Sequence, residues 1–552
     1  MTFAPQDEEL IGTIEEVLSS DIIRQVNNDG DHTYLHIQQE AKTQLPVQNE
    51  AMSITVPLTN PELDVVQFDK SFITMKVKVD IGVTGYTSAV SSDEYLRKAI
   101  DVFVGLKHST DCIGEYSVYH KGKQISGTLQ SNATTESFLY HTYRSEDDLM
   151  NRRGTHTIAR CAASNDLSSI CGEYISADAL KTAQGSSGKI QVAFTFIIPF
   201  NDILAFQQFQ AYPSGLFGEL ELKFKFNKNA LVCLQCHPIE AIKAYAARNS
   251  SIGSAIATIN NTVIGDATKY TKEFTQIGDP FTAIVQASIS SGALALTTGQ
   301  VTLTAGNISI DECYSTLIGY KIRPDARELL QTKFENEPWV KFTQNVNFLP
   351  FSAAPLTNKV SLTQQTYLNN TTDFVLMFPR TQHESGGTVY KNPMLQDLSL
   401  TVMNRKYPEM PLDTASEQFA QIMLNASDTF HNTPLLEYAQ SISVARYTSA
   451  GKIYPNEDLT CFIITLKVER PSAMGLICDG LDSKGQQVSV RLEAKPKVSD
   501  SNIDEYCTQN LGVAPILCTV NDCYFIFNSK DGGQCLHSDK EFNDVLPSFM
   551  GM

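Results

Sequence analysis

Apolar and polar residues alternate along most of the chain from about residue 31 onward. A period of two predicts β-strands that bury one face. The clearest case is Glu219–Phe226, in which Leu220, Leu222, Phe224 and Phe226 share one face and charged residues share the other. Successive side chains of a strand point to opposite sides of a sheet, so these four are expected in a core. Similar strands are predicted at 32–37, 52–56, 72–79, 115–119, 191–198, 283–289, 301–303 and 313–322.

A helical segment at residues 324–338 divides this pattern in two. Pro324 opens the segment, Leu330 and Phe334 lie at helical spacing, and Pro338 closes it. Proline is tolerated at the first position of a helix and ends a helix further along. We therefore predict a connector helix at 324–338. Strands resume at 339–348, 360–368, 374–378, 398–403, 436–445, 460–468, 488–492 and 516–527.

Each β region also contains one short predicted helix that follows a strand and a proline. Behind Pro199, the residues Asn201 and Asp202 can cap a helix at 203–209. Behind Pro408 and Pro411, residues 414–417 form a Thr-Ala-Ser-Glu capping box. Many short strands with few helices between them indicate antiparallel sandwiches, and the fold class is predicted to be all-β.

The first thirty residues have a helical pattern instead. Their apolar positions recur at the spacing of an amphipathic helix, acidic residues fill the opposite face, and Asn27–Gly30 ends the pattern. The apolar stripe needs a partner surface, which is either the rest of its own domain or a neighbouring subunit. The predicted assembly residues are Leu10, Ile14, Val17, Leu18, Ile22 and Val26.

Composition and charge narrow the function. Of the 552 residues, 42% are hydrophobic and 19% are charged, which suits large cores and excludes a disordered chain. The net charge is −18, and residues 1–40 hold one basic residue against nine acidic ones. Binding to nucleic acid requires basic residues that neutralise phosphates. Direct sequence-specific binding of nucleic acid is therefore not expected.

The sequence predicts a protein made in the cytosol. Its beginning is acidic and lacks the basic and apolar regions of a secretory signal. Its most apolar stretches are far shorter than the roughly 20 residues of a membrane span. Twelve cysteines without regular spacing are then expected to be reduced thiols.

Motifs of catalysis or cofactor binding are incomplete. Cys233, Cys236 and His237 match a haem-attachment pattern, but the expected reading is a strand end, and no second ligand pair completes a zinc site. Residues 185–189 resemble a phosphate-binding loop but lack its first glycine and its final Ser/Thr. No nucleophile elbow or zinc-protease motif is present. We expect no enzyme activity, cofactor or metal.

Three stretches of sequence carry a family resemblance. The first runs from Gly105 through the strand at 116–119 and the Lys-rich turn after it to residues 135–137 (Thr-Glu-Ser). The second is the strand–helix–strand passage Phe196–Leu220, and the third is the turn Asn404–Pro408 with the capped helix behind it. They resemble the double jelly-roll major capsid proteins of eukaryotic double-stranded DNA viruses and elements, in the group of Polintons/Mavericks, polinton-like viruses and virophages.

The resemblance implies two tandem antiparallel jelly-roll sandwiches with short inserted helices. It implies a structural protein of the virion, synthesised in the host cytoplasm, whose homotrimers are pseudo-hexagonal capsomers of an icosahedral shell. Neighbouring capsomers and penton or minor capsid proteins would be its partners. The expected domains are an N-terminal arm (1–45), jelly roll 1 with loop insertions at 147–188 and 290–300 (46–323), the connector helix (324–338), jelly roll 2 (339–528) and a C-terminal tail (529–552). The alternative function is a β-sandwich that binds or processes carbohydrate.

Overall fold

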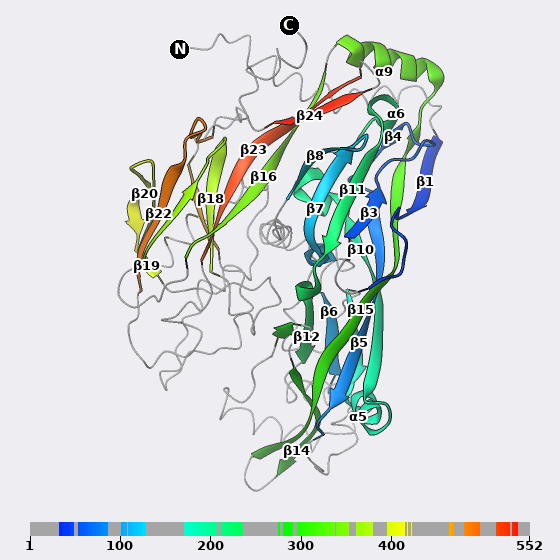
Figure 1. Cartoon of the computed structure of the whole chain (residues 1–552), viewed down its shortest axis with the longest axis vertical. Helices are drawn as coiled ribbons and strands as arrows, with labels where there is room; N and C mark the ends of the chain where they lie inside the picture. Colours follow the sequence, from blue (N-terminus) through cyan, green and yellow to red (C-terminus); the bar gives the residue numbers. More distant parts are fainter. Residues whose placement is uncertain are drawn as a thin grey trace, which may run out of the picture.

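The computed structural model describes two antiparallel β-sandwiches that follow one another along the chain (Figure 1). This confirms the predicted all-β fold class. The described residues are 33–48, 53–86, 101–106, 109–128, 171–206, 211–235, 274–276, 280–290, 295–336, 338–352, 360–378, 395–413, 417, 421, 463–468, 480–496, 515–529 and 533–538.

The second sandwich has the simpler plan. Its eight main strands, in chain order, are β16 (Trp339–Pro350), β17 (Val360–Thr366), β18 (Thr371–Met377), β19 (Leu395–Val402), β20 (Arg405–Leu412), β21 (Ile463–Lys467), β22 (Val488–Pro496) and β23 (Ile516–Asn528). One sheet has the order β16-β23-β18-β21 and the other β17-β22-β19-β20. The first strand therefore pairs with the eighth, the second with the seventh, the third with the sixth and the fourth with the fifth. This nested pairing is that of a long hairpin rolled into two sheets, which is the jelly roll.

The first sandwich repeats this order. Its main strands are β1 (Thr33–Glu40), β3 (Ser53–Pro57), β5 (Phe72–Thr84), β7 (Ile113–His120), β8 (Lys123–Thr128), β10 (Lys189–Pro199), β11 (Leu220–Phe226) and β15 (Ala295–Lys321). Its sheets run β1-β15-β5-β10 and β3-β11-β7-β8. Numbered along the chain, both sandwiches have the orders 1-8-3-6 and 2-7-4-5. Each half of the chain is thus a jelly roll.

The first sandwich is also longer than the second. A further sheet has the order β13 (Phe274–Gln276), β12 (Leu231–Gln235), β6 (Asp101–Leu106) and β9 (Gly172–Ser176), and β14 (Phe281–Ser290) pairs with the extended β15. In Figure 1, β6, β12 and β14 prolong the sandwich away from helix α9 (Pro324–Asn336). The short strands β2 (Val47–Gln48) and β4 (Val65–Val66) also join β15. This sandwich also contains helix α5 (Ala177–Gly185) and the 3-10 helices η2 (Ser109–Cys112) and η6 (Lys228–Ala230).

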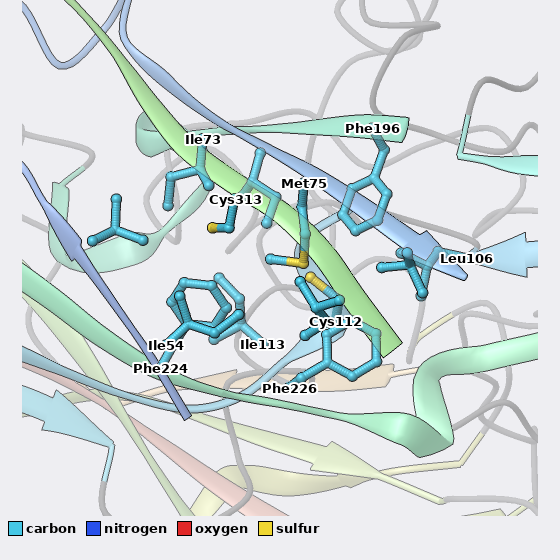
Figure 2. Packing of buried hydrophobic residues seen from close by; sticks show 14 of the residues in the cluster. Ile54, Ile73, Met75, Leu106, Cys112, Ile113, Phe196, Phe224, Phe226 and Cys313 are labelled. Carbon is cyan, nitrogen blue, oxygen red and sulfur yellow. The ribbon is translucent and has the colours of Figure 1, made fainter. Parts of the chain in front are cut away.

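The predicted core face of β11 is confirmed. Leu220, Leu222, Phe224 and Phe226 are each at most 4% exposed, whereas Lys223 and Lys225 between them are exposed. Figure 2 shows Phe224 and Phe226 directed between the sheets, toward Met75 on the opposite sheet. The strand's alternating pattern is therefore the direct cause of its placement.

The predicted connector begins at Pro324 as expected and forms helix α9 (Pro324–Asn336). Leu330 and Phe334 are buried in the core of the first sandwich. The helix therefore packs its apolar residues on the domain that precedes it, and Trp339 begins the next sandwich three residues after the helix ends.

Five expectations differ from the structure. The predicted arm 1–45 includes β1, because β1 pairs residue by residue with Tyr314–Lys321. The predicted tail 529–552 includes β24 (Gln534–Ser538), which pairs with β23. The predicted loop 147–188 contains β9 and α5, and residues 295–300 of the predicted loop 290–300 belong to β15, where they pair with β14. The predicted helix 203–209 is described only to residue 206, and this part forms a 3-10 turn, η5 (Leu204–Phe206), which follows another, η4 (Phe200–Asp202). The capped helix after residue 414 falls largely outside the described residues.

Candidate functional site: the junction between the sandwiches

Aromatic side chains from both sandwiches form one cluster where the two domains meet. Phe217 ends the short helix α6 (Ser214–Phe217) of the first sandwich and stacks on Trp339 of β16, with ring centroids 5.3 Å apart and planes 6° apart. Phe527 of β23 contacts both rings, at 5.5 Å from Phe217 and 5.2 Å from Trp339. Tyr212 and Phe334 close the cluster from the first sandwich and from α9.

This cluster belongs to the hydrophobic core of the first sandwich. Trp339, Phe525 and Phe527 are at most 1% exposed and are continuous with that core, whereas the rest of the second sandwich has a separate core. Burying a large aromatic side chain contributes a few kcal/mol to stability. The second sandwich therefore anchors its first and last main strands in the first one.

A lysine forms a second contact across the junction. Lys121 lies in the turn between β7 and β8, and its Nζ donates a hydrogen bond to the carbonyl oxygen of Gly533, 3.2 Å away, just before β24. A Cβ atom at Gly218 would lie 2.2 Å from Cε of Lys121, and one at Gly533 would lie 2.5 Å from the carbonyl oxygen of Phe217. Both glycines have positive φ angles, so the approach of the lysine requires glycine at both positions.

Sequence reasoning did not single out these junction residues. The signals that could have found them are the single tryptophan directly after the connector and the aromatic-rich run Tyr524–Phe527. Each looks like an ordinary buried strand, because a strand buried within one domain and a strand buried between two domains share one pattern.

The predicted assembly residues Leu10, Ile14, Val17, Leu18, Ile22 and Val26 lie outside the described residues. Their role in assembly stays a prediction. Within the described ranges, the large exposed apolar side chains are Tyr34, Tyr367, Met403 and Met410.

Two of these exposed residues belong to one hairpin, β19–β20. Met403 lies in its two-residue turn and Met410, 84% exposed, on β20 at the edge of the sheet. Pro408 and Pro411 on β20 carry no N–H group. An edge strand with two prolines resists pairing with a strand of another molecule. Any contact made by this edge would therefore rely on side chains.

The outer face of the first sandwich is polar. Lys76 on β5 pairs with Glu312 on β15 at 2.9 Å, and the neighbouring Lys78 pairs with Asp311. The hydrogen bond from Lys78 holds the pKa of Asp311 below its ordinary value. Exposed ion pairs of this kind contribute at most about 1 kcal/mol each. These ion pairs keep charged groups in contact with water on this face.

The motifs with possible chemistry lie only partly in the described residues. Cys233 is buried on β12, where burial raises the pKa of its thiol to about 12, and Cys236 and His237 lie outside the described residues. Residues 185–188 form the turn from α5 to β10, with Gly188 at a positive φ angle. Within the described part of the chain, no three His, Cys, Asp or Glu side chains could together hold a metal ion.

The described cysteines are all buried free thiols, namely Cys112, Cys171, Cys233, Cys313, Cys518, Cys523 and Cys535. We expect nearly all twelve thiols of the chain to react with a thiol reagent in denaturant without reductant. In the native protein, the seven described cysteines should not react, because burial shields them from the reagent. A shortfall of several thiols in denaturant would reveal disulfides and contradict a reduced chain.

No described helix is both long enough and apolar enough to span a bilayer. The strand orders and the shared junction define the class of this protein as a tandem double jelly roll.

No protein-family model and no curated protein matches the chain. Among solved structures, it is similar to PBCV-1 VP54 as fitted into a reconstruction of the virophage Sputnik, with 11% identity, a TM-score of 0.46, and 92% of this chain and 97% of that chain covered. It is also similar to the mavirus major capsid protein, with 10% identity, a TM-score of 0.42, and coverage of 93% and 91%. The Faustovirus major capsid protein has 8% identity, a TM-score of 0.40, and coverage of 93% and 98%. The fold class of this chain rests on its own strand order.

Proposed function

We propose that this chain is a major capsid protein of the double jelly-roll type, which its sequence resembles. The observation that carries the proposal is the repetition of one eight-strand order in two consecutive sandwiches. Such a chain places two similar bodies in one subunit. Three copies around a threefold axis would then present six similar sandwiches, an outline that tiles a shell as a hexagon does.

The junction supports the same function. A capsomer that must match its neighbours needs its two sandwiches at one fixed angle, whereas small polar interfaces between domains allow movement. Here an aromatic cluster centred on Phe217, Trp339 and Phe527 fills the interface, and the Lys121–Gly533 hydrogen bond adds a directional contact. Both features favour a rigid structural unit.

A capsid protein of this type would have two domains joined by a helix, and other capsid proteins as its partners. The first domain would run from β1 to β15, α9 would connect the domains, and the second would run from β16 to β24, with an arm before β1. The protein would act in the virion as a homotrimer that contacts neighbouring capsomers and penton or minor capsid proteins. It would have no catalytic role, and no direct sequence-specific contact with nucleic acid.

The native mass of the purified full-length protein tests this function. A trimer is expected at three times 61.0 kDa, about 183 kDa, by native mass spectrometry or light scattering. Electron micrographs should show particles with a six-cornered outline or closed shells. A stable monomer that is retained on a glycan array would contradict the proposal and favour the carbohydrate-binding alternative.

A further inference from the structure

A histidine is enclosed at the junction. His120 ends β7, is 4% exposed, and its Nε2 lies 2.7 Å from the carbonyl oxygen of Phe217, to which the ring N–H donates. The edge of its ring meets Phe527 of the second sandwich, with centroids 5.8 Å apart and planes 76° apart. His120 therefore contacts both sandwiches and precedes Lys121, which holds Gly533.

The strand β24 begins at the residue after Gly533. It pairs with β23 and also lies beside β8, the edge strand of the first sandwich (Figure 1). Phe525 and Phe527 of β23 pair with His537 and Cys535 of β24. The strand β24 is therefore the direct neighbour of the strand that carries Phe527, the contact of His120. A change at His120 would therefore act on Phe527, on the Lys121–Gly533 bond and on β24 together.

We propose that this junction is an acid-sensitive lock, in which protonation of His120 releases β24 and loosens the two sandwiches from one another. The lock does not depend on the capsid function, because it rests on contacts within one chain.

The surroundings of His120 disfavour its charged form. Burial lowers the pKa of His120 below its ordinary value of 6.5, and the positive charge of Lys121 lowers this pKa further, against the opposing hydrogen bond to Phe217. The ionisable groups nearest to His120 along the adjoining elements are Tyr119 on β7, Lys123 on β8, Tyr212, Glu219 and Glu221 at the start of β11, Tyr524 on β23, and Cys535 and His537 on β24. Glu219 is exposed, and Lys121 is the charged group whose field acts on His120.

Because the closed junction lowers the pKa of His120, acid should favour the open junction. When the junction opens, water reaches His120 and its pKa returns toward 6.5. The open state then binds more protons than the closed state at pH values below about 6.5. Closure is therefore fully stable above pH 6.5 and weakens as the pH falls toward the pKa of the closed state. For one proton, the opening equilibrium rises by up to roughly tenfold per pH unit in this window.

Hydrogen–deuterium exchange of the full-length protein between pH 7.5 and pH 5.0 tests the lock. After correction for the intrinsic pH dependence of exchange, the peptide with Gln534–Ser538 should lose several-fold protection below pH 6.5, while Phe72–Thr84 should not. The emission of Trp339, the only tryptophan of the chain, should shift to longer wavelength over the same range. Equal acid sensitivity of both peptides would overturn the proposal.

Two variants test whether His120 is the group whose protonation opens the junction. His120→Gln keeps a donor for the carbonyl oxygen of Phe217 but cannot be charged, so its Gln534–Ser538 protection should no longer change with pH. His36→Gln removes an exposed histidine on β1 and should behave as the wild type. If His120→Gln folds and retains the acid response, the lock is wrong. If His120→Gln does not fold, the wild-type comparison tests the lock: loss of protection below pH 6.5 in Gln534–Ser538 but not in Phe72–Thr84 supports it, and equal loss in both contradicts it.

Discussion

Replacing Trp339 with alanine is expected to lower the free energy of unfolding by about 3–5 kcal/mol, the usual cost of removing a large buried aromatic side chain. Trp339 is fully buried and contacts Phe217, Tyr212 and Phe527, so its loss leaves a cavity between the sandwiches. We also expect one cooperative transition to divide into two as the domains uncouple. Because no tryptophan remains, circular dichroism and calorimetry should follow the unfolding.

Tyr367→Ala is the matched control. Tyr367 is a large aromatic residue of the same sandwich but is 58% exposed, so its removal should change the stability by no more than about 0.5 kcal/mol. Equal effects of the two substitutions would show that the stacking at the junction does not hold the sandwiches together.

Deleting residues 1–30 is expected to abolish or disorder shell assembly while the trimer remains folded with nearly the same melting temperature. The deletion ends before β1, and all eight residues of β1 keep their pairing with β15. An isolated helix of about twenty residues is marginal in water, so the predicted arm would become ordered only against a partner. Its acidic face disfavours nucleic acid and anionic lipid, which leaves protein, such as an adjacent capsomer or a minor capsid protein. Electron microscopy and native mass measure the two effects separately.

Two variants distinguish the effect of the apolar stripe from the effect of shortening the arm. Leu10→Ser, Ile14→Ser and Val17→Ser together should reproduce the deletion, whereas Glu8→Gln and Glu15→Gln together should assemble as the wild type. Normal particles from the truncated protein would contradict an assembly role. Trimers that fall apart would instead assign the helix to the trimer interface or the domain core.

The local pattern of apolar and polar residues was sufficient to predict a strand or helix wherever that pattern alone determines which of its faces is buried. In β11, alternation alone placed Leu220 and Phe224 in the core, and the two prolines around 324–338 located α9. The same reasoning failed for α5 and β9, which lie in a segment rich in small polar residues. There the pairing of Gly172–Ser176 with β6 outweighs weak strand propensity, as tertiary context often does.

Residues close together in the chain are sufficient to predict the all-β class, the division near residue 324 and the core face of β11. The tertiary structure was needed to establish that β1 pairs with β15 and that β24 pairs with β23. It also placed Phe217, Lys121 and His120 against Trp339, Gly533 and Phe527 of the other sandwich. In each of the three junction pairs, Phe217–Trp339, Lys121–Gly533 and His120–Phe527, the two residues are more than a hundred positions apart in the chain. Hydrophobic pattern shows that such a side chain is buried, and the packing of two whole domains selects the partner that buries it.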